Sequence, residues 1–265
     1  MKIDLLLDPF GTSWEAFLEL AEAAESLGFD GIWTWDHLAG EVHRADRVLE
    51  CWTVLSAVAA RTSRVTIGPL VLNVANRRPG VLAVMAATLQ EVSNGRLVLG
   101  LGAGGGAGTP YVREQAALGA EVPSDPRRRQ QVLDTITICQ QVWTGTTTPL
   151  TLAEGQLGVG RGFLVPQPRP PIVVGGFGPR MAELAGSVAD GFNTQAGHPD
   201  LTNLIDIART ANDGRSPDFE VSGFAGLDPR LVERGADQLD RLILIVAPGG
   251  GVEPIAQFAA SVGLQ

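Results

Sequence analysis

Three groups of residues have the types and spacing that ligand binding and proton transfer require. Asp36-His37 places a carboxylate beside an imidazole, and an imidazole exchanges a proton near neutral pH. Two glycine-rich turns, 102–106 and 175–180, could let backbone N–H groups approach a phosphate. Arg180 adds a fixed positive charge to the second turn. We therefore predict a site that holds a phosphorylated ligand close to a histidine.

Each of these groups also has a purely structural explanation. The glycine run at 102–106 can be a flexible loop, and 175–180 can be an ordinary turn. Asp36-His37 can be a hydrogen-bonding pair of the surface or the core. The run at 102–106 does not match the dinucleotide fingerprint well, because no acidic residue follows at the required distance in a second strand. The residues by themselves leave these alternatives open.

Other common kinds of site find no support in the sequence. The three histidines, His37, His43 and His198, lack the spacing of metal ligands, so we predict no metal site. No serine or cysteine has the surroundings of a nucleophile elbow, which disfavours a hydrolase. The net charge of −9 argues against nucleic acid as a partner.

Length and composition describe an ordinary globular chain. Its 265 residues are 45% hydrophobic and 18% charged, and a chain of this length can bury a full core. No leader-like segment opens the chain and no apolar run reaches about 18 residues, so we predict neither secretion nor a membrane span. Cys51 and Cys139 lie in helical patterns and are expected as buried thiols of a reducing compartment, the cytoplasm.

The candidate site residues follow apolar strands that alternate with helical patterns. This rhythm, with a length near the ~250 residues typical of the fold, predicts a single-domain α/β protein over residues 1–265, of the TIM-type (β/α)₈ barrel class. The segments after the strands of such a barrel meet at one mouth, where Asp8, Asn73 and 193–195 would join the groups above. The expected strands are 3–7, 29–34, 65–72, 96–101, 171–174, 190–194, 219–224 and 242–246.

The clearest unit of the chain runs from Val65 to Gly106. Its first part is an apolar, β-branched strand, followed by a helix that begins at Pro79 and ends at Asn94-Gly95. The strand at 96–101 then leads directly into the glycine run. Strand, helix, strand and glycine loop form a βαβ unit whose ligand-facing end lies at the carboxyl side of its strands.

Two segments interrupt the rhythm of strands and helices. Residues 109–122 are expected to form a mobile loop over the site. Residues 145–171 are rich in Gly, Thr and Pro and have no helical period, so we expect a hairpin-like insertion with an extended arm there. No composition change marks a domain boundary.

Several segments taken together form a recognisable set of motifs. The most telling is NGRLVLGLGAG, from Asn94 to Gly104. The others are GFDGIW at 28–33 leading to Asp36-His37, 68–71 with Arg77 and Pro79, Trp143-Thr144-Gly145, 166–172, 175–180 and 189–192. In order and spacing the set resembles the bacterial luciferase-like family of flavin- and deazaflavin (coenzyme F420)-dependent oxidoreductases. The match runs from Lys2 to about Asn193, and the remainder is shorter than is usual in that family.

The resemblance implies a cofactor that lies across the carboxyl-terminal mouth of the barrel. It also implies a non-prolyl cis peptide at Leu70-Val71 that bulges against the face of the cofactor ring. Asp36, His37 and Asn73 would lie near the ring. Beside the ribityl and phosphate groups would lie Gly102, Ala103, Gly104 and Gly105, and around the phosphate Gly175, Gly176, Phe177, Gly178, Pro179 and Arg180.

The family divides between users of FMN and users of coenzyme F420. The Gly-Pro-Arg helix start at 178–180 and the Asp36-His37 pair resemble the deazaflavin branch. We therefore expect hydride transfer between F420 and a small organic substrate, with His37 as general acid/base and Asp36 beside it as the second catalytic candidate. The alternatives are an FMN-dependent luciferase-like monooxygenase, a non-catalytic flavin-binding member, and a barrel isomerase or lyase acting on a phosphorylated metabolite.

The sequence departs from the sugar-phosphate dehydrogenase branch of that family. The branch carries a tryptophan shortly after the Asp-His pair and a glutamate that closes the glycine loop, where this chain has Glu41 and Gly105. We therefore expect a neutral organic substrate, and the usual carboxylate proton donor is missing. Family members often form homodimers, and the predicted helices at 50–60 and 81–92 are apolar enough to take part.

Overall fold

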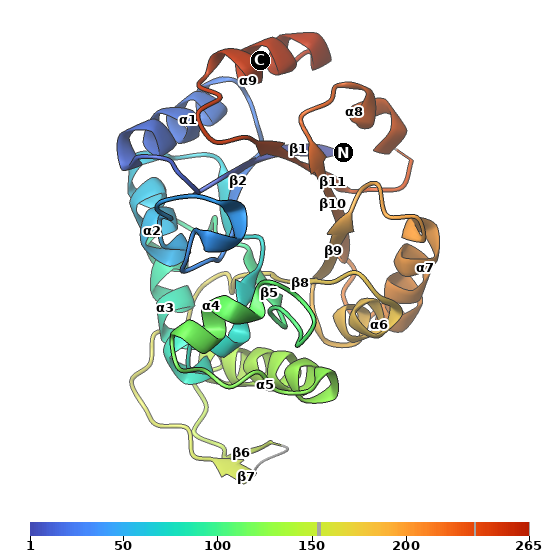
Figure 1. Cartoon of the computed structure of the whole chain (residues 1–265). Helices are drawn as coiled ribbons and strands as arrows, with labels where there is room; N and C mark the ends of the chain where they lie inside the picture. The colour runs from blue at the N-terminus through green and yellow to red at the C-terminus, as the bar shows by residue number, and fades with distance from the viewer. Residues whose placement is uncertain (153–154, 236, 265) are drawn as a thin grey trace.

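A ring of parallel strands forms the centre of the protein (Figure 1), whose computed structural model describes residues 1–152, 155–235 and 237–264. Within these residues nine strands pair in the order β3-β2-β1-β11-β10-β9-β8-β5-β4. Helices surround the ring, which confirms the predicted (β/α)₈ barrel. The strands are β1 Lys2–Leu7, β2 Gly31–Thr34, β3 Thr66–Pro69, β4 Leu72–Asn73, β5 Leu99–Gly102, β8 Ile172–Gly175, β9 Gly191–Gln195, β10 Glu220–Gly226 and β11 Arg241–Val246.

The strands at the two ends of that order, β3 and β4, are neighbours in the sequence. We predicted one strand over 65–72, but the structure divides it at a cis peptide bond between Leu70 and Val71. β3 pairs with β2, β4 pairs with β5, and a bridge joins Ile67 to Leu97. The ring therefore closes through one interrupted strand, and the cis bond that the family resemblance implied is confirmed.

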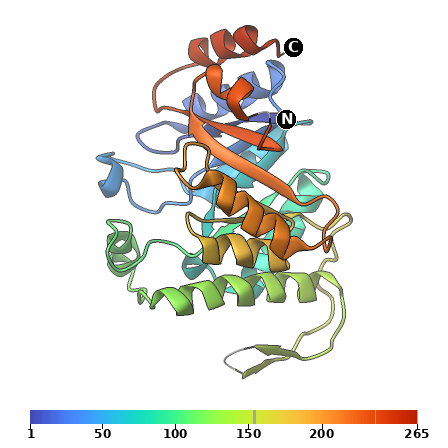
Figure 2. The same cartoon turned by 90° about the vertical axis from the view of Figure 1, so that its right-hand side faces the viewer.

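The helices on the outside of the ring follow the predicted alternation (Figures 1 and 2). α3 and α5 have proline in their first turn, where a missing N–H costs no helical hydrogen bond. No helix among the described residues is long and apolar enough to cross a membrane. The helices are α1 Trp14–Ser26, α2 Cys51–Arg61, α3 Pro79–Val92, α5 Asp125–Trp143, α6 Pro179–Val188, α7 Leu201–Asn212, α8 Arg230–Gly235 and α9 Glu253–Val262, with short 3₁₀ turns η1 Glu41–His43 and η2 Val74–Asn76.

The two segments outside the barrel rhythm have different outcomes. The insertion at 145–171 contains the expected hairpin, an antiparallel pair of β6 Leu150–Leu152 and β7 Gly155–Leu157 that projects from the body (Figure 1). The loop expected at 109–122 instead contains a helix, α4 Val112–Ala117. A helix of six residues is not stable alone, and tertiary packing decides its formation. Its residues Glu114 and Gln115 are buried.

The inside of the barrel is apolar in its middle and charged at its amino-terminal floor. Leu6, Trp33, Leu70 and Ile243 form the inner apolar cluster. Below them, buried Asp4 accepts a hydrogen bond from the Trp33 indole N–H at 2.6 Å and pairs with Arg241. Burial raises the pKa of Asp4, and the charge of Arg241 offsets only part of that rise. The floor is therefore a structural ion-pair network, at the end of the barrel opposite the mouth.

Candidate active site

The predicted polar residues meet at the carboxyl-terminal mouth of the barrel. Asp36 and His37 follow β2, and Asn73 ends β4. The backbone N–H of Asn73 donates to Asp36 at 2.9 Å, and the Asn73 side chain lies against Gly104 of the glycine loop. In Figure 2 the η1 segment in blue and the α4 segment in green protrude on the same side of the molecule. Segments far apart in the sequence thus build one site.

Asp36 lies in a buried ion-pair network. Arg77 donates one hydrogen bond to each of its carboxylate oxygens, both at 2.9 Å, and the Asp36 side chain is fully buried. Arg77 also pairs with Glu50 at 2.5 Å, and Glu50 caps the amino terminus of α2. The network ties the end of β2 to the start of α2 and to the segment after β4. Both oxygens of Asp36 are therefore occupied by donors of the protein itself.

The charges of this network stabilise one another. Burial alone would raise the pKa of Glu50, but hydrogen bonds from Thr53 and Trp52 and the charge of Arg77 outweigh it, so the pKa is lowered. Burial alone would lower the pKa of Arg77, but Asp36 and Glu50 raise it overall. Glu50 and Arg77 are therefore held as ions at neutral pH. The stabilisation from Glu50 is present above its ordinary pKa and is lost as the pH falls through its lowered value.

His37 is held by a carboxylate that the sequence did not reveal. Its Nδ1 lies 3.1 Å from Oε2 of Glu114, and the backbone N–H of Ala39 reaches the same oxygen at 3.4 Å. Burial alone would raise the pKa of Glu114, but the hydrogen bond and charge of His37 and the backbone N–H groups of Leu38 and Ala39 lower it overall. Because an ionised carboxylate only accepts hydrogen bonds, we assign the proton to Nδ1.

Aromatic rings enclose the imidazole of His37. Phe10, Tyr111 and His43 have ring centroids 5.2, 5.4 and 5.5 Å from it. Phe10 and His43 are themselves stacked, with centroids 4.1 Å apart and planes 26° from parallel. The His37 side chain keeps 20% of its surface exposed, and Nε2 has no hydrogen-bond partner in the part of the chain that the structure describes. This nitrogen is therefore available to a bound molecule.

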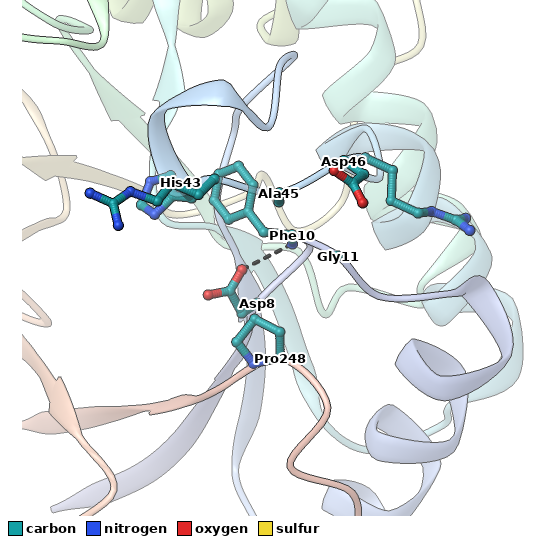
Figure 3. Close-up of a pocket in the computed structure, with 9 residues that line it drawn as sticks. Asp8, Phe10, Gly11, His43, Ala45, Asp46 and Pro248 are labelled. Atoms are coloured by element: carbon teal, nitrogen blue, oxygen red, sulfur yellow. Dashed lines mark hydrogen bonds between the residues drawn. The ribbon is translucent and has the colours of Figure 1, made fainter.

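A cleft of about 520 Å³ adjoins these rings (Figure 3). Burial raises the pKa of Asp8 at its base, although the Phe10 backbone N–H and the charges of His43 and His37 partly offset the rise. Burial and the charge of His37 lower the pKa of His43. None of the predicted cofactor-binding residues is among those that line the cleft, which are Asp8, Phe10, Gly11, His43, Arg44, Ala45, Asp46, Arg47 and Pro248.

The glycine loop after β5 is packed against neighbouring side chains. A Cβ at Gly104 would lie 2.4 Å from Oδ1 of Asn73, and one at Gly105 would lie 2.6 Å from Cβ of Tyr111. Arg128 of α5 donates to the carbonyls of Ala103 and Gly104. Both glycines are therefore needed for close approach of the site's own residues. The loop is a fixed part of the site wall, and Arg128 is a contributor that the sequence did not point to.

Val71 fills the space that two other glycines leave open. A Cβ at Gly102 would lie 2.4 Å from Cγ2 of Val71, and one at Gly175 would lie 2.9 Å from its Cγ1. Gly102 ends β5 and Gly175 ends β8, so Val71 reaches both neighbouring strand ends. The predicted cofactor residues Val71, Gly102 and Gly175 are thus in mutual contact.

We expect Gly102→Ala to lower the free energy of unfolding by about 1–3 kcal/mol, because the added methyl group collides with Val71 in a packed interior. A second substitution, Val71→Ala, should recover part of that loss in the double variant. Urea denaturation of the single and double variants measures both effects. Gly108→Ala is the matched control, since no atom lies within 4 Å of a Cβ there. A double variant no more stable than Gly102→Ala would contradict the packing explanation.

The turn after β8 presents a different surface to the mouth. Gly178 is the N-cap of α6 and Pro179 its first residue. Arg180 is exposed and has no hydrogen-bond or ion-pair partner among the described residues. Phe177 is 59% exposed, and its ring lies 6.2 Å from that of Phe224. The turn therefore offers a free cation, a helix amino terminus and an aromatic face.

Two further features complete the mouth. Trp35 follows β2 and meets Phe224 of β10 edge to face, with ring centroids 5.5 Å apart. Asn193, expected near the mouth, is level with Gly175 in the strand register, is buried, and donates to Ser222 at 2.8 Å. Across residues 1–152, 155–235 and 237–264, no group of three or more His, Cys, Asp or Glu side chains could hold a metal ion.

The fold and the mouth define a class of protein: a (β/α)₈ barrel with polar and glycine-rich segments at the carboxyl ends of its strands. The chain belongs to the luciferase-like monooxygenase family, whose pattern it matches over residues 5–235. A similar curated protein is an F420-dependent glucose-6-phosphate dehydrogenase of Microbacterium testaceum, 34% identical over 181 residues, which are 68% of this chain and 52% of that protein.

Other relatives extend the comparison. A putative coenzyme F420-dependent oxidoreductase of Mycobacterium tuberculosis is 31% identical over 266 aligned positions, covering 87% of this chain and 71% of that protein. The chain spans about half the length of the glucose-6-phosphate dehydrogenases it matches.

Solved structures of two proteins share the fold. An F420-dependent secondary alcohol dehydrogenase with an F420-acetone adduct has a TM-score of 0.73 at 22% identity, covering 100% of this chain and 82% of that one. A monooxygenase of Streptomyces bottropensis has a TM-score of 0.75 at 22% identity, covering 98% and 97%. At these identities the likeness concerns the fold alone.

Proposed function

We propose that this protein is an oxidoreductase that transfers a hydride between coenzyme F420 and a small organic substrate. The observation that carries the proposal is the placement of His37, with a free Nε2, at a mouth that also holds Asn73 and the glycine loop. The names of the relatives support F420 as the cofactor, since the similar curated proteins are described as F420-dependent.

The residues of the mouth fit such a cofactor. The amino terminus of α6 has no side-chain cap at Gly178. The N–H groups of Met181 and Ala182 donate to the Gly178 carbonyl, so attraction for a phosphate would come from the helix dipole and from Arg180, which has no partner among the described residues. Asn73, 102–105 and Val71 would lie along the rest of the cofactor, as the family resemblance implies. Bound F420 would supply a carrier that takes or gives two electrons as a hydride.

The chain's own residues would then handle the proton. His37 would accept a proton at Nε2 when the substrate is oxidised and return it when the substrate is reduced. We assign Asp36 a positioning role and no direct part in proton transfer, because Arg77 and the Asn73 backbone occupy both of its oxygens. Through these two contacts Asp36 keeps the residues around His37 in place.

We also propose that the substrate is neutral and is not a sugar phosphate. The rim of the mouth carries the aromatic rings of Trp35, Phe177 and Phe224, and the chain has lysine only at position 2, on the barrel floor. Glu41, at the position where the sugar-phosphate branch has tryptophan, is exposed on η1. An aromatic rim favours an apolar substrate.

The decisive test is a side-by-side equilibrium titration of the purified chain with F420 and with FMN, followed by tryptophan quenching and cofactor fluorescence. We expect micromolar binding of F420 and at least tenfold weaker binding of FMN.

Reduced F420 with a panel of small ketones, acetone and cyclohexanone among them, then reports turnover through the absorbance of oxidised F420. Preference for FMN would favour the alternative of an FMN-dependent monooxygenase. Binding of neither cofactor, or no turnover of any ketone, would overturn the proposal.

We further propose that two copies associate through α2 and α3. The support is a row of exposed valines on α3, Val81, Val84 and Val92, whose exposed fractions are 54, 37 and 56%. Light scattering of the purified chain measures the mass, and a monomer at micromolar concentration would contradict this.

We infer a cytoplasmic location, which the free, buried thiols of Cys51 and Cys139 support.

A further inference from the structure

We propose that Glu114 is the positioning residue of His37. It holds the imidazole as the Nδ1–H tautomer, so that the lone pair of Nε2 faces a hydroxyl-bearing substrate, and it balances the charge that the ring gains with the proton. This inference rests on the proposed function, in which His37 takes and returns the proton of the substrate.

The contacts and burial of Glu114 allow it to position the His37 imidazole. Its side chain is only 5% exposed, and its Oε2 receives the Nδ1–H of His37 at 3.1 Å and the backbone N–H of Ala39 at 3.4 Å. The carboxylate is thus fixed by donors from the segment that carries His37. A fixed acceptor at Nδ1 determines which ring nitrogen keeps the proton and how the ring is turned.

No other carboxylate near His37 can take the same role. Asp36, its neighbour in sequence, is saturated by Arg77 and by the backbone of Asn73. Asp8 influences His37 only through space, and its Oδ1 accepts the backbone N–H of Phe10. The other groups that face the ring are Phe10, His43 and Tyr111, none of which is a carboxylate.

The position of Gly105 explains how α4 brings a carboxylate to this place. A Cβ at Gly105 would lie 2.6 Å from Cβ of Tyr111, the residue that precedes α4. Only glycine therefore lets the start of α4 pack onto the glycine loop. In the sugar-phosphate branch a glutamate stands at this position, according to the resemblance. In this chain Gly105 has no side chain, and the start of α4, the helix that carries Glu114, packs into the space beside it.

In the proposed step an alcohol is oxidised to a carbonyl compound. The substrate's hydroxyl proton would pass to Nε2 of His37 as the carbinol C–H bond breaks and a carbonyl C=O bond forms. Bound F420 would supply the acceptor for the electron pair of that C–H bond, taken up as a hydride. The substrate would thus be oxidised by two electrons, which the bound cofactor would take up. Glu114 keeps the Nδ1 proton in place throughout and stabilises the imidazolium. In the reverse direction the imidazolium returns its proton to the carbonyl oxygen.

The first experiment reads the tautomer of His37 without any turnover. ¹⁵N NMR of histidine-labelled protein at pH 8 resolves three histidines, and the signals missing in His37→Asn assign His37. We expect the Nδ1–H form in the parent and a shift toward the Nε2–H form in Glu114→Ala. The same tautomer in both proteins would overturn the proposal. Because F420 is not needed, this result stands even if the proposed function fails.

The second experiment measures kinetics on the ketone that the parent reduces fastest. Glu114→Gln keeps an acceptor but removes the charge, and we expect kcat to fall ten- to hundredfold while the Kd of F420 and the KM of the ketone change less than twofold. Glu114→Gln in the His37→Asn background should cause no further loss, because both residues act as one unit. Glu19→Gln, at an exposed carboxylate on α1 outside the barrel, is the matched control. The proposal would be overturned if the double variant lost kcat by the product of the two single losses. It would also be overturned if Glu114→Gln kept the kcat of the parent.

Discussion

His37→Asn is expected to lower kcat/KM about a hundred- to a thousandfold on the ketone turned over fastest by the parent. Asparagine can still donate a hydrogen bond to Glu114, so the docking of α4 should persist, but it cannot accept or return a proton. Loss of a general acid/base typically removes this order of rate. Steady-state kinetics with reduced F420 in excess measures the effect.

Two comparisons make this prediction specific to His37. The Kd of F420 should change less than threefold in His37→Asn, because the phosphate end of the proposed site lies at α6. His198→Asn is the control histidine, since His198 follows β9 and accepts only the backbone N–H of Asp200. Kinetics equal to those of the parent in His37→Asn, with F420 bound, would exclude His37 from proton transfer.

Arg77→Met is expected to lower the free energy of unfolding by about 3–5 kcal/mol. The side chain of Asp36 is fully buried, and without Arg77 its charge would lack a partner, while Glu50 would lose its 2.5 Å contact. Removing one member of a buried ion pair costs this much because the desolvated partner is left uncompensated. Urea denaturation at pH 7 measures the change in the free energy of unfolding.

Urea denaturation of two further variants distinguishes the loss of a buried ion pair from the loss of an exposed one. Arg61→Met removes an exposed pair with Glu22 and should cost less than about 1 kcal/mol. Asp36→Asn combined with Arg77→Met should recover part of the loss, since the remaining buried group is then neutral. A loss below about 1 kcal/mol in Arg77→Met would show that the network is not a main support of the site.

The sequence by itself determined the barrel and the place of its mouth. The strands are short apolar runs and the helices have a 3.6-residue period, so each element is encoded locally. Turn glycines and first-turn prolines fixed where helices begin and end, as at Pro79 and Pro179. Once eight strands alternate with helices, the segments after the strands can only meet at one end. His37, Asn73 and the glycine loop were found in this way.

Tertiary structure alone decided how the residues of the mouth pair. Glu114 is 77 residues from His37, and Arg77 is 41 residues from Asp36. Neither pair has a local signature, because acidic and basic side chains are compatible with exposed helices and loops everywhere in the chain. α4 was missed for the same reason, since six residues carry too little periodicity and its helix depends on packing at the mouth.

The function of the glycines was also decided in three dimensions. The sequence offered two explanations for 102–106, a flexible loop or an approach to phosphate. In the folded protein Gly104 and Gly105 make room for Asn73 and Tyr111, while Gly102 and Gly175 make room for Val71. From a glycine in the sequence one can infer only that a side chain is absent. Which neighbour occupies that space depends on strands that are distant in the sequence and adjacent only in the closed barrel.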